Sequence, residues 1–298
     1  MLEAGMEPVR GYTLIEKLGR GGSGVVWLAS SPTGEEVALK FIQCKNRSSI
    51  SLSKEVRVLL RLRDVKHPNI IDLKDVVATS NYLVLVMELA DGCLAELQRA
   101  YLQETNRPIP PDHLLELLEQ AAEALDFLAH QPVPSIVNSG TGMQHCDVKP
   151  SNLLLLGDSL KVADFGLCMS SLGWTQGNRF IGTPPYAAPE LYKGKVTRQT
   201  DQYGLAVTFC ELCTNGRVFV DNIVDSLDGP ICPINPARLR TNESEVIMRA
   251  IDPDWTNRWG SCTEFITKLN EAMAEPRITL AQQKLSATGA RSKLSNRN

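Results

Sequence analysis

Short apolar runs separated by turns predict strands in the first third of the chain. Runs rich in β-branched and aromatic residues span 12–18, 25–29 and 37–42, with a glycine cluster and a turn between them. A further apolar run at 83–89 is typical of a buried strand. Residues 53–62 place valine and leucine at helical spacing. The pattern therefore predicts several strands and one helix in the N-terminal part.

Helical periodicity dominates the remainder of the chain. Apolar residues recur at helical spacing over 94–102 and 112–130, and a Pro-Pro-Asp sequence starts the second of these helices. Residues 201–212 are apolar nearly all round, as in a helix that is buried on every side. Two short apolar runs, 153–156 and 160–162, flank a turn, which predicts a β-hairpin among the helices.

Polar side chains with chemical capability flank this hairpin at both ends. Asp147, Lys149 and Asn152 precede its first strand, and Asp164 follows its second. Because a hairpin brings its two ends together, we expect these groups to converge. They suit a substrate hydroxyl, a phosphoryl group and Mg²⁺, which prefers one or two oxygen ligands from the protein. The alternative is a polar turn whose Asp and Asn side chains only cap the backbone.

The glycine cluster suggests a second binding element. Gly19, Gly21 and Gly24 form a G-x-G-x-x-G pattern, and glycines let a backbone approach a phosphate closely with its N–H groups. The same pattern also marks dinucleotide-binding folds and ordinary turns. Here a strand-like run follows it instead of a helix, which argues against the dinucleotide arrangement.

Composition narrows the class of protein. The 298 residues are 43% hydrophobic, enough for one large domain or two lobes, and the formal charge of −3 gives no attraction to nucleic acid or membranes. Among eight cysteines, Cys210 and Cys213 form a C-x-x-C with no second pair to complete a zinc site, so core cysteines are the better interpretation. No secretory signal or membrane-length apolar run is visible. We therefore expect a cytoplasmic protein with reduced thiols, no membrane span and no nucleic-acid partner.

Taken together, the motifs resemble those of the protein kinase family, in its serine/threonine and eukaryotic-like form. The matching positions are His145, Asp147 and Asn152 for the catalytic loop, Asp164-Phe165-Gly166 for the metal-binding DFG, Gly19, Gly21, Gly24 and Val26 for the Gly-rich loop, Val37–Lys40 for the V-A-I-K strand, and residues 182–190 for the end of the activation segment. One position departs from the family pattern, because Cys146 stands where an arginine usually precedes the catalytic Asp.

The resemblance covers about residues 10–270 and implies the two-lobed α+β protein kinase fold. It implies a small β-sheet plus helix as the N-lobe and a mainly helical C-lobe. The expected division is an N-terminal extension at 1–11, the N-lobe at 12–89, the C-lobe at 90–274 and a basic tail at 275–298. The tail carries no acidic residue after Glu275, and its composition predicts disorder.

The implied reaction is transfer of the γ-phosphoryl group of Mg²⁺-ATP to protein Ser or Thr hydroxyls, including autophosphorylation. The resemblance implies that Asp147 accepts or orients the substrate hydroxyl and that Lys149 offsets the charge on the γ-phosphate. It implies that Lys40, held by Glu55, binds the α- and β-phosphates. It also implies that Asn152 and Asp164 bind Mg²⁺, or Mn²⁺ in its place. For Glu55, the alternative to the ion pair with Lys40 is a charged side chain on the surface. The implied ATP-binding set is Leu18, Gly19, Gly21, Gly24, Val26, Ala38, Lys40, the gatekeeper Met87, the hinge residues Glu88 and Ala90, Leu154 and Asp164.

Further positions follow from the same resemblance. Lys149 and Thr183 match serine/threonine kinases rather than tyrosine kinases. Asp201 is expected to hold the backbone of the catalytic loop, and Arg258 to pair with Glu190. The sequence carries no signal for an oligomeric state.

Two other functions compete with this interpretation. A pseudokinase scaffold is expected to have lost one of Lys40, Asp147 and Asp164, and all three are present. A small-molecule phosphotransferase is disfavoured by the G-T-P-P-Y-A-A-P-E segment, which in kinases shapes a peptide site.

Cys146 leads to a hypothesis about regulation. In kinases with an arginine at this position, the arginine pairs with a phosphorylated activation-loop residue and orders the loop. Cysteine carries no such charge. We therefore expect activity to depend little on phosphorylation of Ser170, Ser171 or Thr175.

Overall fold

The computed structural model describes residues 2–21, 24–43, 59–60, 63–131, 142–164, 182–216, 234–235, 239 and 241–274. Five of its strands form an antiparallel sheet in the order β1-β2-β3-β5-β4. Their bounds are β1 Thr13–Gly21, β2 Gly24–Ser30, β3 Glu36–Gln43, β4 Leu73–Ala78 and β5 Tyr82–Met87. The strands predicted at 12–18, 25–29, 37–42 and 83–89 are thereby confirmed, each within a few residues.

The two faces of this sheet have different surroundings because side chains alternate along a strand. Trp27, Leu39 and Val86 are buried on one face, together with Val9 of the segment that precedes β1. The N–H of Leu14 donates to Met6 O at 2.8 Å, which ties this segment to β1. The opposite face carries Ala38, Lys40, Leu83 and Leu85, and its two leucines pack in the large core cluster that also contains the helices.

The predicted hairpin is confirmed. Strands β7 Leu153–Leu156 and β8 Ser159–Val162 pair with Leu153 opposite Val162, and β6 Gly92–Cys93 adds a third strand at the edge of β7. Gly157 turns the chain with a left-handed φ of 57°, and its N–H donates to the Asp91 carboxylate at 2.7 Å. The hairpin therefore brings residue 152 beside residue 163, where the N–H of Ala163 donates to Asn152 O at 2.9 Å.

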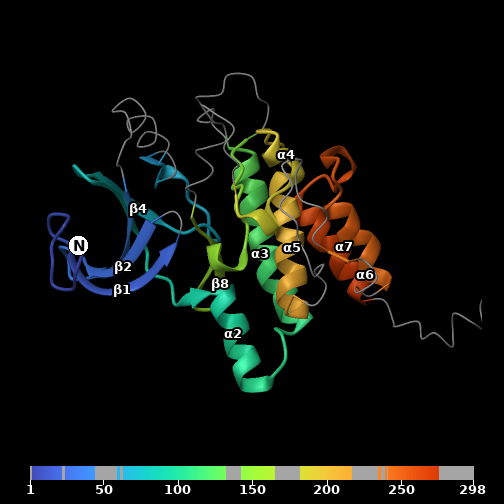
Figure 1. Ribbon diagram of the computed structural model, residues 1–298, viewed down its shortest axis with the longest axis horizontal. Helices are drawn as coiled ribbons and strands as arrows, with labels where there is room; N and C mark the ends of the chain where they lie inside the picture. The colour runs from blue at the N-terminus through green and yellow to red at the C-terminus, as the bar shows by residue number, and fades with distance from the viewer. Residues whose placement is uncertain are drawn as a thin grey trace, which may run out of the picture.

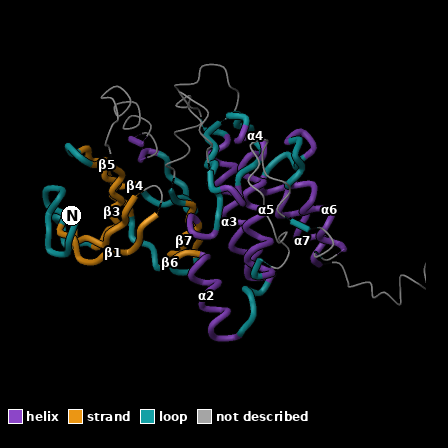
Figure 2. The backbone as a smooth tube through the Cα atoms, viewed as in Figure 1, coloured by secondary structure: helices purple, strands orange, loops and turns teal. Residues whose placement is uncertain are grey.

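Helices make up most of the chain after the hinge. They are α2 Leu94–Thr105, α3 Pro111–Ala129, α4 Pro189–Tyr192, α5 Thr200–Thr214, α6 Thr241–Ala250 and α7 Cys262–Ala274, with short 3₁₀ turns η1 Pro150–Asn152, η2 Pro184–Tyr186 and η4 Trp255–Asn257. Figure 1 shows α3, α5, α6 and α7 packed on the side of the molecule opposite the sheet, with β8 and α2 between. The same division into strands and helices is visible along the backbone tube in Figure 2.

Sequence features explain how the central helices form. Pro111 begins α3, where its fixed φ and missing N–H carry no penalty. Helix α5 is buried on nearly every side, as its apolar composition predicts, and it packs with α3 and α7. The Asp126 carboxylate on α3 accepts the N–H groups of Cys262 and Thr263 at 2.9 and 2.8 Å, so α3 caps the start of α7.

Other sequence predictions fall partly or wholly outside the described residues. The helix predicted at 53–62 is described only at its end, where 59–60 and 63–64 are helical. The basic tail at 275–298 is not described. Cys210 is fully buried and Cys213 half-buried on α5, and no disulfide links the cysteines of the described ranges. Within those ranges, no helix is both long and apolar enough to cross a membrane.

Candidate active site

A cavity of about 380 Å³ lies between the five-stranded sheet and the β7–β8 hairpin. Most of the residues predicted to line an ATP site line this cavity: Leu18, Gly19, Val26, Ala38, Lys40, Met87, Glu88, Ala90, Leu154 and Asp164. Asn152 lines it as well. Within the described ranges, Gly21 and Gly24 lie outside the lining, at the end of β1 and the start of β2.

Gly24 has a steric reason to be glycine. Its φ is +150°, and a Cβ at this position would lie 2.3 Å from the carbonyl oxygen of Phe41 on the neighbouring strand β3. A side chain here would therefore push β2 away from β3.

Some lining residues belong to no motif. Cys93, Glu96 and Ser151 line the cavity although the sequence analysis did not single them out. Glu96 accepts the N–H of Cys93 at 3.1 Å at the start of α2. The sequence around Cys93 gives little indication of this position, because the two-residue strand β6 pairs with β7 only in the folded chain.

Two charged side chains meet at the back of the cavity. The Lys40 ammonium lies 2.6 Å from Oδ1 of Asp164, and Lys40 is only 5% exposed. Asp164 has a left-handed φ of 68°, an uncommon backbone conformation for a residue other than glycine. Glu55, the predicted partner of Lys40, lies outside the described residues.

Asp147 receives three donated hydrogen bonds on its carboxylate, which is buried with 6% exposure. Thr183 Oγ1 donates to Oδ1 at 2.7 Å, and Lys149 Nζ and Asn152 Nδ2 donate to Oδ2 at 2.7 and 3.0 Å. Lys149 also donates to Thr183 Oγ1 at 2.7 Å. The expected convergence of Asp147, Lys149 and Asn152 is therefore found, and the carboxylate is fixed in one orientation.

Asn152 and Asp164 fit a divalent cation. Asn152 uses its amide nitrogen for bonds to Asp147 O and Oδ2, so its amide oxygen Oδ1 is directed away from Asp147. Both residues line the same cavity. The described residues contain no cluster of three or more His, Cys, Asp or Glu that would form an all-protein site. One amide oxygen and one carboxylate match the few protein ligands that Mg²⁺ takes beside phosphates and water.

The backbone that presents Asp147 is anchored from below by a buried carboxylate. Asp201 accepts the N–H groups of His145 and Cys146, each at 2.7 Å, as expected. Burial raises the pKa of the Asp201 carboxyl, while His145 and the two N–H donors act in the opposite direction. His145 Nε2 donates to Ala163 O at 2.8 Å, and its Nδ1 accepts the N–H of Asp147 at 3.2 Å. The imidazole thus joins the two ends of the hairpin.

Cys146 lies within this anchored loop and faces the core. It is 4% exposed, has a φ of 63°, and its thiol donates weakly to Gln144 O at 3.7 Å. The position therefore presents no cation to the surface.

A half-buried polar pair lies next to the segment that ends the activation region. The Tyr186 hydroxyl donates to the Glu211 carboxylate of α5. Burial and this hydrogen bond raise the pKa of Tyr186, and burial raises the pKa of Glu211. Tyr186 thus remains a neutral donor that joins η2 to α5.

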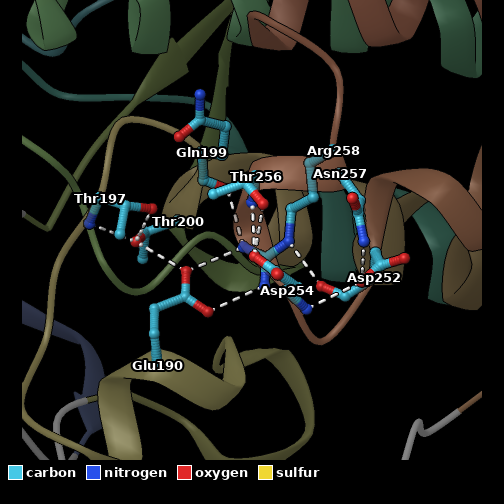
Figure 3. Close-up of polar contacts among 9 residues, drawn as sticks. All are labelled: Glu190, Thr197, Gln199, Thr200, Asp252, Asp254, Thr256, Asn257 and Arg258. Atoms are coloured by element: carbon cyan, nitrogen blue, oxygen red, sulfur yellow. Dashed lines mark hydrogen bonds and ion pairs between the residues drawn. The ribbon is translucent and has the colours of Figure 1, made fainter.

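The expected pair between Glu190 and Arg258 is confirmed, and Figure 3 shows its surroundings. Nη1 and Nη2 of Arg258 donate to the two carboxylate oxygens of Glu190, each at 2.8 Å, and both side chains are buried. Further hydrogen bonds hold the pair, since Arg258 donates to the carbonyl oxygens of Gln199 and Asp252 and Thr200 donates to Glu190. This planar, two-bond geometry fixes α4 to the 252–258 loop.

Comparison with known proteins points to one family. The sequence matches the protein kinase domain family over residues 12–287. It is 36% identical over 238 residues to the serine/threonine-protein kinase PkaA of Streptomyces coelicolor, covering 72% of this chain and 41% of that protein. It is 27% identical over 272 residues to the probable serine/threonine-protein kinase PknB of Lactococcus lactis, covering 86% of this chain and 41% of that protein. The chain therefore spans about two-fifths of the length of these curated relatives.

Proposed function

Since the chain belongs to the protein kinase domain family, we propose that it transfers the γ-phosphoryl group of Mg²⁺-ATP to serine or threonine hydroxyls of proteins, including its own. The observation that carries this proposal is the set of three donors on Asp147, beside a cavity that also contains Lys40 and Asp164. The kinase names of the two relatives support the same reaction.

The reaction needs positioning and charge neutralisation more than covalent chemistry, because its transition state is largely dissociative. Asp147 would accept or orient the attacking hydroxyl, with its carboxylate held by Thr183 and Lys149. A positioned general base typically accelerates a reaction by about 10²- to 10⁴-fold. Lys149 would also offset negative charge on the transferred group.

The phosphates and the cation would meet where Lys40 and Asp164 meet. The ammonium and the carboxylate lie 2.6 Å apart, so phosphate oxygens held by Lys40 and a cation held by Asp164 would be neighbours. Bound Mg²⁺ would supply charge neutralisation to the phosphates, and Mn²⁺ would use the same oxygen ligands, Asn152 and Asp164. The pairing of Lys40 with Glu55 remains a proposal that rests on the family resemblance.

Serine and threonine are the proposed acceptors because Lys149 and Thr183 match the serine/threonine form of the family and both relatives carry that name. The side chains of Lys149, Thr183 and Asp147 form one continuous hydrogen-bonded set at 2.7 Å per contact. Protein substrates, rather than small molecules, fit the 182–190 segment, which is anchored by the pair of Glu190 and Arg258. A cytoplasmic location, predicted from the sequence, stays a prediction.

Phosphoamino-acid analysis tests this function. The chain is incubated with labelled Mg²⁺-ATP and a generic basic protein, and phosphoserine or phosphothreonine is expected on that protein and on the chain itself. Phosphotyrosine as the main product would contradict the acceptor assignment. Nucleotide binding without any transfer would favour the pseudokinase alternative.

A further inference from the structure

Glu88 lines the cavity, but its carboxylate contacts two residues outside the lining, Asp72 and Lys161. Its Oε1 accepts the N–H of Asp72 at 2.8 Å and lies 3.0 Å from the Lys161 ammonium. The N–H of Glu88 donates in turn to Asp72 O at 3.0 Å. One carboxylate oxygen thus joins three segments: the hinge, the start of β4 and strand β8.

The ion pair between Glu88 and Lys161 is largely buried. The two side chains are 20% and 14% exposed, whereas those of the neighbouring pair between Lys66 and Asp72 are 65% and 38% exposed. Because solvent screens a buried pair less than an exposed one, the inner pair contributes more to holding its segments. The four charges cancel, so no net charge is left at this site.

Lys161 stands on the strand that leads to the proposed metal ligand. It is three residues before Asp164 and points to the opposite side of β8 from Leu160 and Val162, which are buried in the core. The N–H and carbonyl of Val162 bond to the backbone of Asn69 and Ile71 at 2.8 and 3.0 Å.

Leu160, the residue before Lys161 on β8, also has both of its backbone groups hydrogen-bonded. Leu160 N donates to Gln120 Oε1 at 2.9 Å, and its carbonyl oxygen accepts the side-chain amide of Asn69 at 3.0 Å. These bonds fix β8 to α3 and to the 69–71 segment. The direct side-chain contact from β8 to the hinge is made by Lys161, whose ammonium lies 3.0 Å from the Glu88 carboxylate.

We propose that the ion pair between Glu88 and Lys161 is a positioning device that couples the adenine-binding hinge to the metal-binding Asp164. Through this pair, the two walls of the cavity keep the spacing that a nucleotide with a bound cation requires. The consequence is that the gain in nucleotide affinity produced by Mg²⁺ depends on Lys161. This inference rests on the proposed function, because it assumes ATP in the cavity.

The two ends of the pair respond differently to its loss. Without Lys161, Glu88 keeps both bonds to Asp72, so the hinge retains its position. Strand β8 loses its direct side-chain contact with the hinge and keeps its backbone bonds to residues 69–71, and Asp164 lies two residues after the end of this strand. We therefore expect weaker binding of ligands that need the cation and little change for ligands that use the hinge alone.

The experiment measures binding of three ligands to the full chain and to Lys161→Met: adenosine, ATP with a chelator, and ATP with Mg²⁺. Adenosine affinity should stay within about twofold, while Mg²⁺-ATP affinity should fall by about 2- to 30-fold, the usual range for a coupling residue. The KM for ATP should rise by a similar factor with a smaller change in kcat. A purely structural role would lower thermal stability without this split between ligands.

Matched variants complete the test. Lys74→Met removes an exposed pair to Glu35 at 3.3 Å and should leave all three affinities unchanged. Lys161→Arg keeps the charge and should retain Mg²⁺-ATP affinity; if Lys161→Met does not fold, Lys161→Arg is compared with Glu88→Gln, which should show the loss. Equal Mg²⁺-ATP affinity in the charge-removing variant and the unmodified chain would overturn the inference. An unmodified chain that binds none of the ligands would instead overturn the proposed function.

Discussion

Thr183 donates its hydroxyl to Asp147 Oδ1 at 2.7 Å, although the two residues are 36 positions apart. Lys149 donates to both Thr183 and Asp147. The end of the activation region therefore fixes the carboxylate that would receive the substrate hydroxyl. The orientation of the Asp147 carboxylate therefore depends on the position of the Thr183 side chain.

Replacing Thr183 tests this link. Thr183→Val keeps the shape but removes the hydroxyl, and a hydrogen bond to a charged group contributes about 1.5–3 kcal/mol, so kcat should fall by about 10- to 100-fold. The KM for ATP should change by less than about twofold, because Thr183 is not among the described residues that line the nucleotide cavity. Steady-state kinetics measure both values. Thr183→Ser is the control and should retain most of the activity; a Thr183→Val variant with unchanged kcat would refute the link.

Gly204 on α5 leaves no room for a side chain beneath the catalytic loop. A Cβ there would lie 2.9 Å from Val148 O and 3.3 Å from Tyr186 O. Gly→Ala in a helix is ordinarily stabilising by about 0.5–1 kcal/mol. Here we expect the opposite sign, a loss of about 1–3 kcal/mol from overpacking, together with a lower kcat because Val148 follows Asp147.

Denaturant unfolding and kinetics of Gly204→Ala measure these effects. Cys213→Ala, a half-buried position on the same helix, serves as the control and should leave kcat unchanged. Greater stability of Gly204→Ala than of the unmodified chain would show that α5 and the catalytic loop have space to separate.

The buried pair of Glu190 and Arg258 predicts a large loss of stability when one partner is removed. Arg258→Met leaves a buried carboxylate without its counter-charge, which typically costs about 3–5 kcal/mol. The double variant Glu190→Gln with Arg258→Met should recover part of this loss. Chemical denaturation gives the free energies of unfolding.

An exposed pair on the same half of the molecule provides the comparison. Lys268→Met breaks a contact to Glu271 at 2.7 Å whose side chains are 41% and 59% exposed, and it should cost less than about 1 kcal/mol. Arg258→Met and Lys268→Met with equal stabilities would contradict the assignment of Arg258 as a buried anchor.

Cys146 predicts weak dependence on activation-loop phosphorylation. Its thiol is buried beside Asp147, and cysteine has no cationic group that could pair with a phosphate. The variant with Ser170, Ser171 and Thr175 all changed to Ala should therefore keep at least half of the turnover of the unmodified chain. These three residues lie outside the described ranges, so the test is kinetic. Loss of most of the turnover would disprove the hypothesis.

Local pattern was sufficient to predict those parts of the fold that form between neighbours in sequence. The β7–β8 hairpin follows from two short apolar runs around turn residues, α3 follows from helical spacing, and the structure contains both. The hairpin also predicts that Asp147, Lys149 and Asn152 lie near Asp164, because a hairpin brings its two ends together, and Asn152 and Asp164 line the same cavity. Motif order added the distant members of the cavity, such as Lys40 and Val26.

Contacts that depend on tertiary packing left no such signal. The pairing of Glu88 with Lys161 joins residues whose relation is set by how β8 lies behind the hinge. Gly204 looks like an ordinary helix glycine until the Val148 carbonyl is seen above it. Cys93 enters the cavity only because β6 pairs with β7. The secondary-structure propensity of a segment does not determine which distant segment it will contact, so these three contacts could not be predicted from it.

The central claim is that Asp147 serves the acceptor hydroxyl in a phosphoryl transfer from ATP. The most direct test compares transfer from labelled Mg²⁺-ATP by the unmodified chain and by Asp147→Asn, with ATP affinity measured on both. We expect phosphoserine or phosphothreonine from the unmodified chain, a rate lowered by at least about 10²-fold in the variant, and ATP affinity within about twofold. Equal rates in the two proteins, or no transfer by the unmodified chain, would contradict the account.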